Sequence, residues 1–343
     1  KEEFAVTIML PPTKGLVALA YQEEIESLGG RVYKVAPYRQ IFTHLRETYS
    51  ILKENHYQVM HAWDNTLNVF PMCVGKQAGV KVRISESISK GDRNEKKTLV
   101  KYMLKPFSHC FATHFMANSI DCGVWQFGRK TYDRGLIHIF KTVINAEENA
   151  FDKDLRDRTR EKYGWKDKIV YGFIGRFVPQ KNPLFLIDIF KEIAKMQDNA
   201  LFVIIGFGEL EQEMVNRINE HGIQDLVLNL GRTDDIKQFY NAFDAFLLPS
   251  LYEGMPVVGI EAQCCGLPIF FSQNVTKETT ATDLAYYIGL DDSAEQWAEK
   301  ITEVVNAMRC LRRSYANEIK QNGFDSQNEA MRLLKFYLDT VHG

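Results

Sequence analysis

Short apolar runs alternate with helical patterns along the whole chain, and this alternation is the feature that most constrains the fold. The runs of the first half are FAVTIML (4–10), RVYKVA (31–36), YQVMHAW (57–63), VKVRIS (80–85) and CFATHFMA (110–117). Those of the second half are KIVYGFIG (168–175), LFVIIG (201–206), LVLNLG (226–231), AFLLPS (245–250) and LPIFF (267–271). Alternation of this kind predicts an α/β fold with parallel sheets covered by helices. Near-continuous apolar runs are typical of buried parallel strands.

The chain is long enough for two domains. It has 343 residues, of which 45% are hydrophobic and 25% charged, and this is the composition of a globular protein. The segment 145–168 is strongly charged and has no apolar run, so we place the domain junction near residues 145–150. We predict a domain over 1–148, a second over 149–322, and a C-terminal helix over 323–343.

Charge and cysteine usage exclude several classes of protein. The net charge of −2 gives no broad positive field, so we expect no nucleic-acid partner. The six cysteines lack the paired CxxC spacing of a zinc ribbon or a redox site, which favours a reducing cytoplasm. No run approaches the roughly 20 apolar residues of a membrane span, and the first residues lack the order of a signal peptide.

The stretch YEGMPVVGIEAQCCGLP (252–268) holds two glutamates eight positions apart. Pro256 suits the first position of a helix and Gly266 its C-terminal stop. Glu253 then lies in the loop before the helix and Glu261 on its second turn. Carboxylates at the end of a parallel strand can accept hydrogen bonds from sugar or ribose hydroxyls. From spacing alone, a Glu253 that caps the helix and a Glu261 on a solvated face carry equal weight.

A second group of candidate residues follows the strand at 168–175. Gly175 allows a ligand to approach the backbone closely, and Arg176 and Lys181 carry positive charges that suit a diphosphate. Surface charges with no ligand are an equal alternative for the two cations. The motif IIGFGEL (204–210) makes Gly206 a candidate for a phosphate or base contact, although the full GxGxxG is absent.

The motifs FIGRFVPQKNP, VIIGFGEL and LNLGRTDDIKQFYNAFDAFLLPSLYEGMPVVGIEAQCCGLPI together resemble family 4 glycosyltransferases of the GT-B fold. They look most like bacterial enzymes that build capsular polysaccharide or exopolysaccharide. The resemblance implies two Rossmann-like domains that face a central cleft, with a C-terminal helix that packs back on the first domain. It also implies retaining transfer from a nucleotide-diphosphate sugar, most readily a UDP-sugar, to a glycan or lipid-linked acceptor.

The same resemblance gives the candidate residues roles. Glu253 would contact the donor sugar and Glu261 the ribose, while Arg176 and Lys181 would stabilise the departing diphosphate. No cofactor or metal is expected, and the DKD at 152–154 is interpreted as solvated charge. The implied donor-binding residues are Gly175, Arg176, Lys181, Gly206, Arg232, Glu253, Gly254, Met255, Pro256 and Glu261.

The N-terminal half departs from the family pattern. The family's first strand and its glycine-rich loop are either missing, or represented by FAVTIML and a divergent PPTKG. Glu86 stands where a histidine is expected and could act on the acceptor hydroxyl as a catalytic residue, with Asp64 as a competitor. The alternatives for the neighbouring residues are a helix-capping Asp64 and a structural His61.

The lysines and apolar residues of 90–107 follow helical spacing, which allows contact with anionic lipid or an ordinary solvated face. Both interpretations of this segment fit a cytoplasmic protein. Peripheral contact with the inner face of the membrane is an option. If the first strand and loop are missing, the alternative function is a donor-binding or partner-binding subunit without turnover. A dinucleotide-dependent oxidoreductase is disfavoured, because the opening GxGxxG is absent.

Overall fold

A computed structural model describes residues 7–10, 22–89, 98–233, 235–308 and 311–342. The chain forms two compact units. The first comprises Lys1–Ala117, Gly123–His138 and Phe336–Gly343, and the second Asn118–Cys122 and Ile139–Lys335. The domain boundaries at 148 and 322 that we infer from the sequence stay predictions.

The first unit contains two parallel sheets. One pairs β1 (Thr7–Leu10) with β2 (Arg31–Lys34) in parallel. The other has the order β3-β4-β5-β6, with strands β3 (Val59–Ala62), β4 (Val82–Ser87), β5 (His114–Ala117) and β6 (Ile137–Ile139). The helices of the first half are α2 (Gln22–Ser27), α3 (Ile41–Asn55), α4 (Val69–Ala78), α5 (Thr98–Leu104), α6 (Ile120–Phe127) and α7 (Arg129–Asp133), joined by the short 3-10 helices η1 (Tyr38–Gln40), η2 (Asn65–Asn68) and η3 (Lys105–Phe107).

Strand β1 bears on the two interpretations of the N-terminus. It lies within FAVTIML, and its residues Thr7–Leu10 pair with Arg31–Lys34 of β2 in parallel register. This pairing agrees with the alternative in which FAVTIML forms the first strand. PPTKG (11–15) lies outside the described residues.

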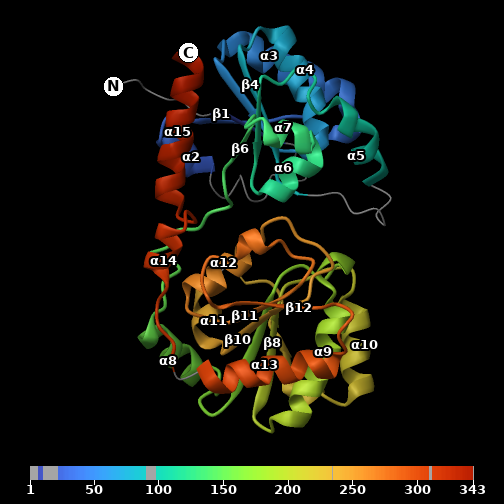
Figure 1. The fold of residues 1–343 in the computed structure, drawn as a ribbon, viewed down its shortest axis with the longest axis vertical. Helices are drawn as coiled ribbons and strands as arrows, with labels where there is room; N and C mark the ends of the chain where they lie inside the picture. Colours follow the sequence, from blue (N-terminus) through green and yellow to red (C-terminus); the bar gives the residue numbers. More distant parts are fainter. Residues whose placement is uncertain (1–6, 11–21, 90–97, 234, 309–310, 343) are drawn as a thin grey trace. The chain divides into compact units, whose positions relative to one another are not determined.

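The second unit is built on one six-stranded sheet with the order β12-β11-β10-β7-β8-β9. Its strands are β7 (Ile169–Ile174), β8 (Ala200–Ile205), β9 (Val227–Asn229), β10 (Ala245–Leu248), β11 (Ile269–Ser272) and β12 (Ala285–Ile288). Its helices are α8 (Lys153–Lys162), α9 (Pro183–Met196), α10 (Glu211–His221), α11 (Lys237–Ala242), α12 (Val257–Cys264), α13 (Ala294–Met308) and α14 (Ala316–Gln321), with 3-10 helices η4 (Pro179–Lys181), η5 (Gln224–Leu226) and η6 (Lys277–Thr279). Helix α15 (Ser326–His342) begins in the second unit and ends in the first. The sequence predicts five of these strands. It does not predict β12, nor β6 in the first unit. Strands β8, β10, β11 and β12 are labelled in Figure 1.

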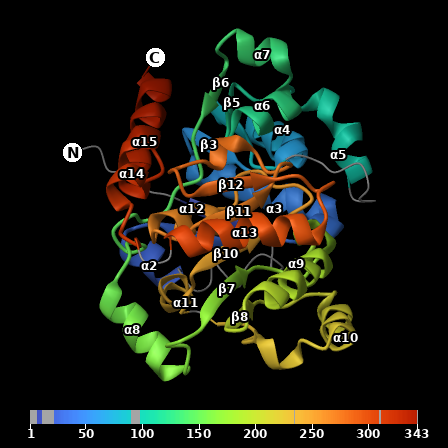
Figure 2. The ribbon, with the colours of Figure 1, turned by 60° about the horizontal axis from the view of Figure 1, so that its bottom comes forward.

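The continuous burial of the strands explains their apolar runs. All residues of β7, β10 and β11 are buried, as expected of parallel strands that are covered on both faces. Helix α9 packs beside α10 and against α13, and Figures 1 and 2 show the three grouped together. Residue 172, inside β7, is a glycine because a Cβ there would come within 2.1 Å of the Phe243 ring.

The final helix, α15, ends in the first unit, as the resemblance implies. The Phe336 ring lies against the rings of His114 and His138, at centroid distances of 5.7 and 4.7 Å. The Tyr337 hydroxyl lies 2.8 Å from His61 Nδ1. The end of α15 therefore packs on the face of the β3–β6 sheet that carries these histidines.

Candidate functional site

The candidate site forms where two neighbouring strands of the second unit end. Strands β7 and β10 pair in parallel, so the loops that follow them leave the sheet at the same edge. Lys181, at the end of the first loop, lies with its Nζ 2.5 Å from Oε1 of Glu253 in the second loop. Their side chains are only 14% and 8% exposed. The structure therefore brings these two predicted residues together as a largely buried ion pair.

Gln180 is a further member of the site that the sequence did not reveal. Its Nε2 donates hydrogen bonds to Glu253 Oε2 at 3.2 Å and to the Tyr252 carbonyl at 3.1 Å. Its own carbonyl accepts from the Leu251 amide at 2.8 Å. The carboxylate of Glu253 is thus held on both oxygens, which fixes its orientation. Glutamine after proline is not a recognisable signal in a single sequence, so only the fold identifies this residue.

Arg176 differs from Lys181 in its surroundings. It follows Gly175 directly after β7, and its side chain is exposed. Within the described residues, its guanidinium makes no hydrogen bond or ion pair. The charge of Lys181 is offset by Glu253, whereas that of Arg176 is not. A diphosphate near the end of β7 would therefore meet Arg176 as the uncompensated cation.

The glycines of the GFG motif have a structural explanation. Gly206 has φ +150°, and a Cβ there would lie 1.9 Å from the carbonyl oxygen of Gly175. A Cβ on Gly208 would lie 2.3 Å from the carbonyl oxygen of Phe177. The loop after β8 therefore packs backbone to backbone against the loop after β7. Close packing accounts for Gly206 without a ligand, and a phosphate contact there stays a prediction.

Glu261 has a different partner from Glu253. It lies in α12, and its Oε2 accepts a 2.7 Å hydrogen bond from the hydroxyl of Tyr240 in α11. Burial raises the pKa of Glu261, and the hydrogen bond from Tyr240 acts in the opposite direction. Burial and the nearby Glu261 raise the pKa of the Tyr240 hydroxyl well above its ordinary value. Tyr240, 2% exposed, therefore serves as a neutral donor to the carboxylate.

The structure agrees with neither alternative for the glutamate pair, in which Glu253 caps the helix and Glu261 lies on a solvated face. Residues 257–264 form α12, so the predicted helix is present but begins one residue after Pro256, which keeps an extended conformation. No side chain caps its N-terminus, so Glu253 is not a cap. Glu261 is partly buried and hydrogen-bonded rather than solvated.

The other residues predicted to contact the donor differ in their surroundings. Met255 is 6% exposed and packs in a small apolar cluster with Ile260 and Phe324, so its side chain has a packing role. Gly254 joins the Glu253 loop to Pro256. Arg232 is exposed and follows Gly231, whose φ is +63°. The structure brings neither Gly254 nor Arg232 to a charged partner in the part of the chain that it describes.

Glu86 belongs to a separate group in the first unit. Its Oε2 lies 3.1 Å from His61 Nε2, and both side chains are mostly buried. The Nδ1 of His61 contacts the Tyr337 hydroxyl, whose pKa is raised by burial and by the charge of Glu86. Asp64 instead accepts from the hydroxyl of Tyr38 at 3.3 Å and does not cap η2. The structure therefore pairs Glu86 with His61 and separates Asp64 from that pair.

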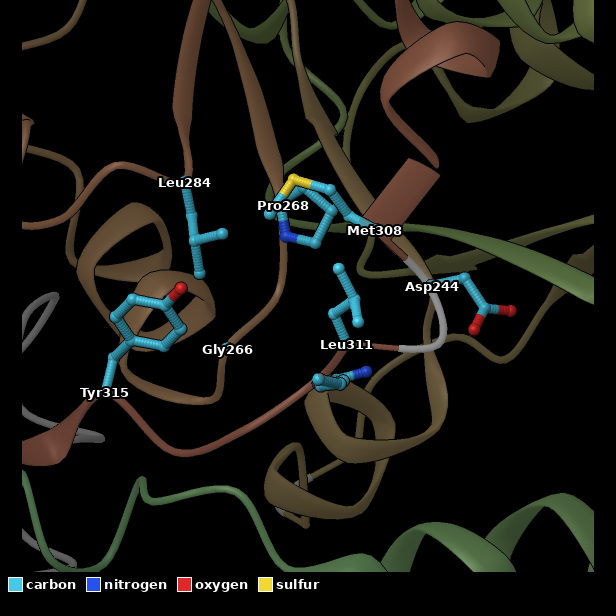
Figure 3. A pocket seen from close by; sticks show the side chains of 8 residues that line it. Asp244, Gly266, Pro268, Leu284, Met308, Leu311 and Tyr315 are labelled. Atoms are coloured by element: carbon cyan, nitrogen blue, oxygen red, sulfur yellow. The ribbon is translucent and has the colours of Figure 1, made fainter. Parts of the chain in front are cut away.

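Two other features do not form the site. Asp152 of the DKD sequence caps α8 by accepting from the Leu155 amide, and Lys153 pairs with Asp157. Figure 3 shows a small pocket in the second unit, and no predicted site residue lines it. Its lining residue Arg312 binds the carbonyls of Tyr240, Phe243 and Cys265, so its donors are already used by the backbone. This pocket is therefore a feature of packing.

Helix α5 exposes several large apolar side chains. Leu99, Val100 and Met103 are 67%, 51% and 65% exposed, and Phe107 in η3 is 53% exposed. Residues 90–97 of the predicted amphipathic helix lie outside the described part of the chain. Among the helices that the structure describes, none combines the length and the apolar character that crossing a bilayer requires.

Comparisons with known proteins identify the family of this chain. The family described as Glycosyl transferases group 1 matches residues 156–324, the segment that carries the candidate site. Over 326 residues the chain is 30% identical to EpsF of Bacillus subtilis, a protein named as a glycosyltransferase, and the match covers 93% of this chain and 85% of EpsF. The chain belongs to the group 1 glycosyltransferases.

Two further comparisons are informative. The chain is 25% identical to the Escherichia coli UDP-Gal:alpha-D-GlcNAc-diphosphoundecaprenol alpha-1,3-galactosyltransferase, over 85% of this chain and 78% of that enzyme. The structure of Anabaena HepE in complex with UDP-glucose superposes with a TM-score of 0.76 at 17% identity, over 93% of this chain and 89% of HepE. The predicted GT-B fold class, with two Rossmann-like parallel-sheet domains, is confirmed.

Proposed function

We propose that this glycosyltransferase is a retaining enzyme that moves a sugar from a nucleotide-diphosphate donor, in the first instance a UDP-sugar, to a glycan or lipid-linked saccharide. The observation that carries the proposal is the meeting of the loops after β7 and β10, where Lys181 and Gln180 hold the Glu253 carboxylate. A carboxylate fixed in this way offers an oriented acceptor for sugar hydroxyls.

In this proposal the two glutamates bind different parts of the donor. Glu253 contacts the sugar and Glu261 the ribose hydroxyls, with Tyr240 holding Glu261 in place. Gly175, Gly206, Arg232 and the Gly254–Pro256 segment would contribute backbone or base contacts. Breaking the anomeric bond leaves negative charge on the diphosphate, and fixed cations lower the barrier most where charge develops. Arg176 is the cation free to do this, and Lys181 adds its charge once the donor is bound.

No cofactor is required in the proposed mechanism, because protein cations neutralise the leaving group. The expected consequence is that transfer persists in the presence of a chelator. Substitution of Arg176 by glutamine would then lower kcat by about 10²-fold or more, the usual effect of removing one preorganised charge from a transition state.

The acceptor side of the proposal rests on the first unit. Glu86 is the candidate to bind or deprotonate the acceptor hydroxyl, and His61 Nε2 lies 3.1 Å from its carboxylate. The name of the Escherichia coli relative includes a diphosphoundecaprenol acceptor, which supports a lipid-linked saccharide as the acceptor class here. A cytoplasmic protein that contacts the inner face of the membrane through the region of residues 90–107 fits such an acceptor, and the exposed apolar residues of α5 support this contact.

The pairing of β1 with β2 argues against the alternative of a subunit without turnover, which rests on a missing first strand and loop. The experiment that separates the two is direct. The protein is incubated with a panel of UDP-, GDP- and ADP-sugars and a lipid-linked saccharide, and the product is examined by NMR for its anomeric configuration. Transfer with retention supports the proposal. Donor binding without transfer or hydrolysis supports the subunit instead.

A further inference from the structure

Trp63 is the most exposed of the four tryptophans of the chain, all of which lie within the described residues. It is 43% exposed, whereas Trp165 and Trp297 are 3% and 0% exposed and Trp125 is half-buried. An indole ring at the surface leaves a large apolar area in contact with water, which costs free energy. Neither the donor site nor the core explains why this ring lies at the surface.

Trp63 follows β3 directly and lies beside the candidate acceptor residues. The parallel register of β3 and β4 pairs Ala62 with Ser85, so the next step of the register sets Trp63 beside Glu86. Side chains two positions apart along a strand point to the same face, which is the face of His61. The rings of His61 and Trp63 meet edge to face, with centroids 5.8 Å apart. The indole is therefore an exposed aromatic surface next to a carboxylate.

The loop that carries Trp63 is held in place by two asparagines. Asn68 accepts from the Asp64 amide at 2.7 Å through Oδ1, and its Nδ2 donates to the carbonyl that precedes Trp63 at 2.9 Å. Asn65 Oδ1 accepts from the amides of residues 88 and 89 at 2.8 and 3.1 Å. Both asparagines are buried. A ring on a loop fixed in this way loses little conformational entropy when a ligand stacks on it.

We propose that Trp63 is a stacking platform for a pyranose ring of the acceptor saccharide, with Glu86 beside it to accept a hydrogen bond from a hydroxyl of the same sugar. A pyranose with mostly equatorial hydroxyls has a face of C–H bonds, and stacking removes apolar surface of both rings from water. The side chain of Glu86 keeps 15% of its surface exposed, which leaves room for one such contact. This inference deepens the proposed function and rests on it, since it names the group of the acceptor that the first unit recognises.

An anionic bilayer is the poorer occupant of this surface. The charged side chains next to Trp63, along the chain and across the sheet, are the carboxylates of Asp64 and Glu86. Asp64 accepts from the Tyr38 hydroxyl at 3.3 Å, and no cation pairs with it among the printed contacts of the described residues. Anionic headgroups repel carboxylates, whereas sugar hydroxyls donate to them. The charge around the ring therefore favours a saccharide.

The test is titration of the full chain with the methyl β-glycosides of glucose, galactose and N-acetylglucosamine, with sorbitol as a polyol that has no pyranose ring. Tryptophan fluorescence reports binding to the wild type, and saturation-transfer NMR reports binding to every variant. Trp63→Ala removes the ring, and Trp63→Phe keeps a smaller one. The matched control is Phe42→Ala, which removes an 87% exposed ring from α3 of the same unit.

At least one glycoside should quench or shift the wild-type fluorescence, and sorbitol should not. Trp63→Ala should bind that glycoside about 10-fold more weakly, Trp63→Phe within about three-fold of wild type, and Phe42→Ala as wild type does. In the transfer assay, Trp63→Ala should raise the KM for the acceptor by the same factor. The kcat and the KM for the donor should not change, because the ring binds the ground state and the transition state alike.

Three results would overturn the inference. They are no glycoside binding by the wild type, equal glycoside binding by Trp63→Ala and the wild type, and equal binding of sorbitol and the glycosides. A Trp63→Ala variant that loses binding to anionic vesicles and keeps the glycoside would assign the ring to a bilayer instead. Calorimetry with UDP, without any saccharide, shows whether the variants are folded. Absence of UDP binding by the wild type would contradict the proposed function, whereas UDP binding with unchanged glycoside binding would contradict only this inference.

Discussion

Lys181 Nζ and Glu253 Oε1 lie 2.5 Å apart, although 72 residues separate them in the chain. The pair joins the loops after two adjacent strands at the edge of the sheet where parallel folds bind their ligands. Because both side chains are largely buried, each charge depends on the other. The pair therefore has consequences for stability as well as for donor binding.

Substitution Lys181→Gln should destabilise the protein, because it leaves the Glu253 carboxylate without its cation. The expected loss is roughly 3 kcal/mol in the free energy of unfolding, at the lower end of the cost of breaking a buried pair. The double variant Lys181→Gln/Glu253→Gln should lose less than the sum of the two single variants, as measured by urea unfolding. Lys153→Gln, which breaks the exposed pair with Asp157, is the control and should cause no measurable change.

Glu261→Gln should separate ligand binding from stability. Burial raises the pKa of Glu261, so the folded state holds the proton at higher pH than the unfolded chain does. The stability from this group is fully present below the unfolded glutamate pKa and is lost as pH rises through the raised folded value. Glutamine cannot ionise, so the unliganded variant should gain Tm relative to wild type as pH rises through this range.

The same variant should bind nucleotide roughly 10- to 100-fold more weakly, since a hydrogen bond to a charged group contributes about 1.5–3 kcal/mol. Calorimetry with UDP at neutral pH measures this. An unchanged affinity would remove Glu261 from the donor site and leave it a structural residue.

Tyr240→Phe tests the role of the hydroxyl that holds Glu261. The hydrogen bond from Tyr240 favours the carboxylate, so its removal should raise the pKa of Glu261 further. The acid limb of a plot of nucleotide affinity against pH should move to higher pH, with about a five-fold loss of affinity at neutral pH. A pH profile that overlays the wild-type curve would show that Tyr240 only fills space.

Gly206→Ala should be more damaging than an ordinary glycine replacement. A Cβ at this position would meet the Gly175 carbonyl at 1.9 Å and would push the loops after β7 and β8 apart. The cost should exceed about 3 kcal/mol, the upper range of usual overpacking. Gly222→Ala is the control, since Gly222 has φ +67° and open space around it, and should cost about 1 kcal/mol. Thermal unfolding of both variants gives the comparison.

The sequence predicts the architecture well where burial is continuous. Strands β7, β8, β10 and β11 coincide with apolar runs because they are buried on both faces, and the strand end at Gly175 follows from the same pattern. The sequence does not predict strand β12, because the strand AYYI is short and only partly buried. Strand β6 is only three residues long, and the sequence does not predict it for a similar reason.

The sequence names candidate site residues but does not show how they pair. Glu253, Glu261, Arg176 and Lys181 are visible as motifs, but spacing along the chain does not show which charge meets which. The assignment of both cations to a diphosphate therefore missed that Lys181 is already paired with Glu253. Tyr240 and Gln180 could not be found, because each acts through a contact made only when distant segments pack together.

The central claim is that this second unit binds a nucleotide-diphosphate sugar and that the chain transfers the sugar. The most direct measurement is release of nucleoside diphosphate from a panel of UDP-, GDP- and ADP-sugars, with and without a lipid-linked saccharide, by wild type and by Arg176→Gln. We predict acceptor-dependent release from at least one UDP-sugar in the presence of a chelator, and about 10²-fold slower release by the variant. No release and no binding for any donor in the panel would contradict the account.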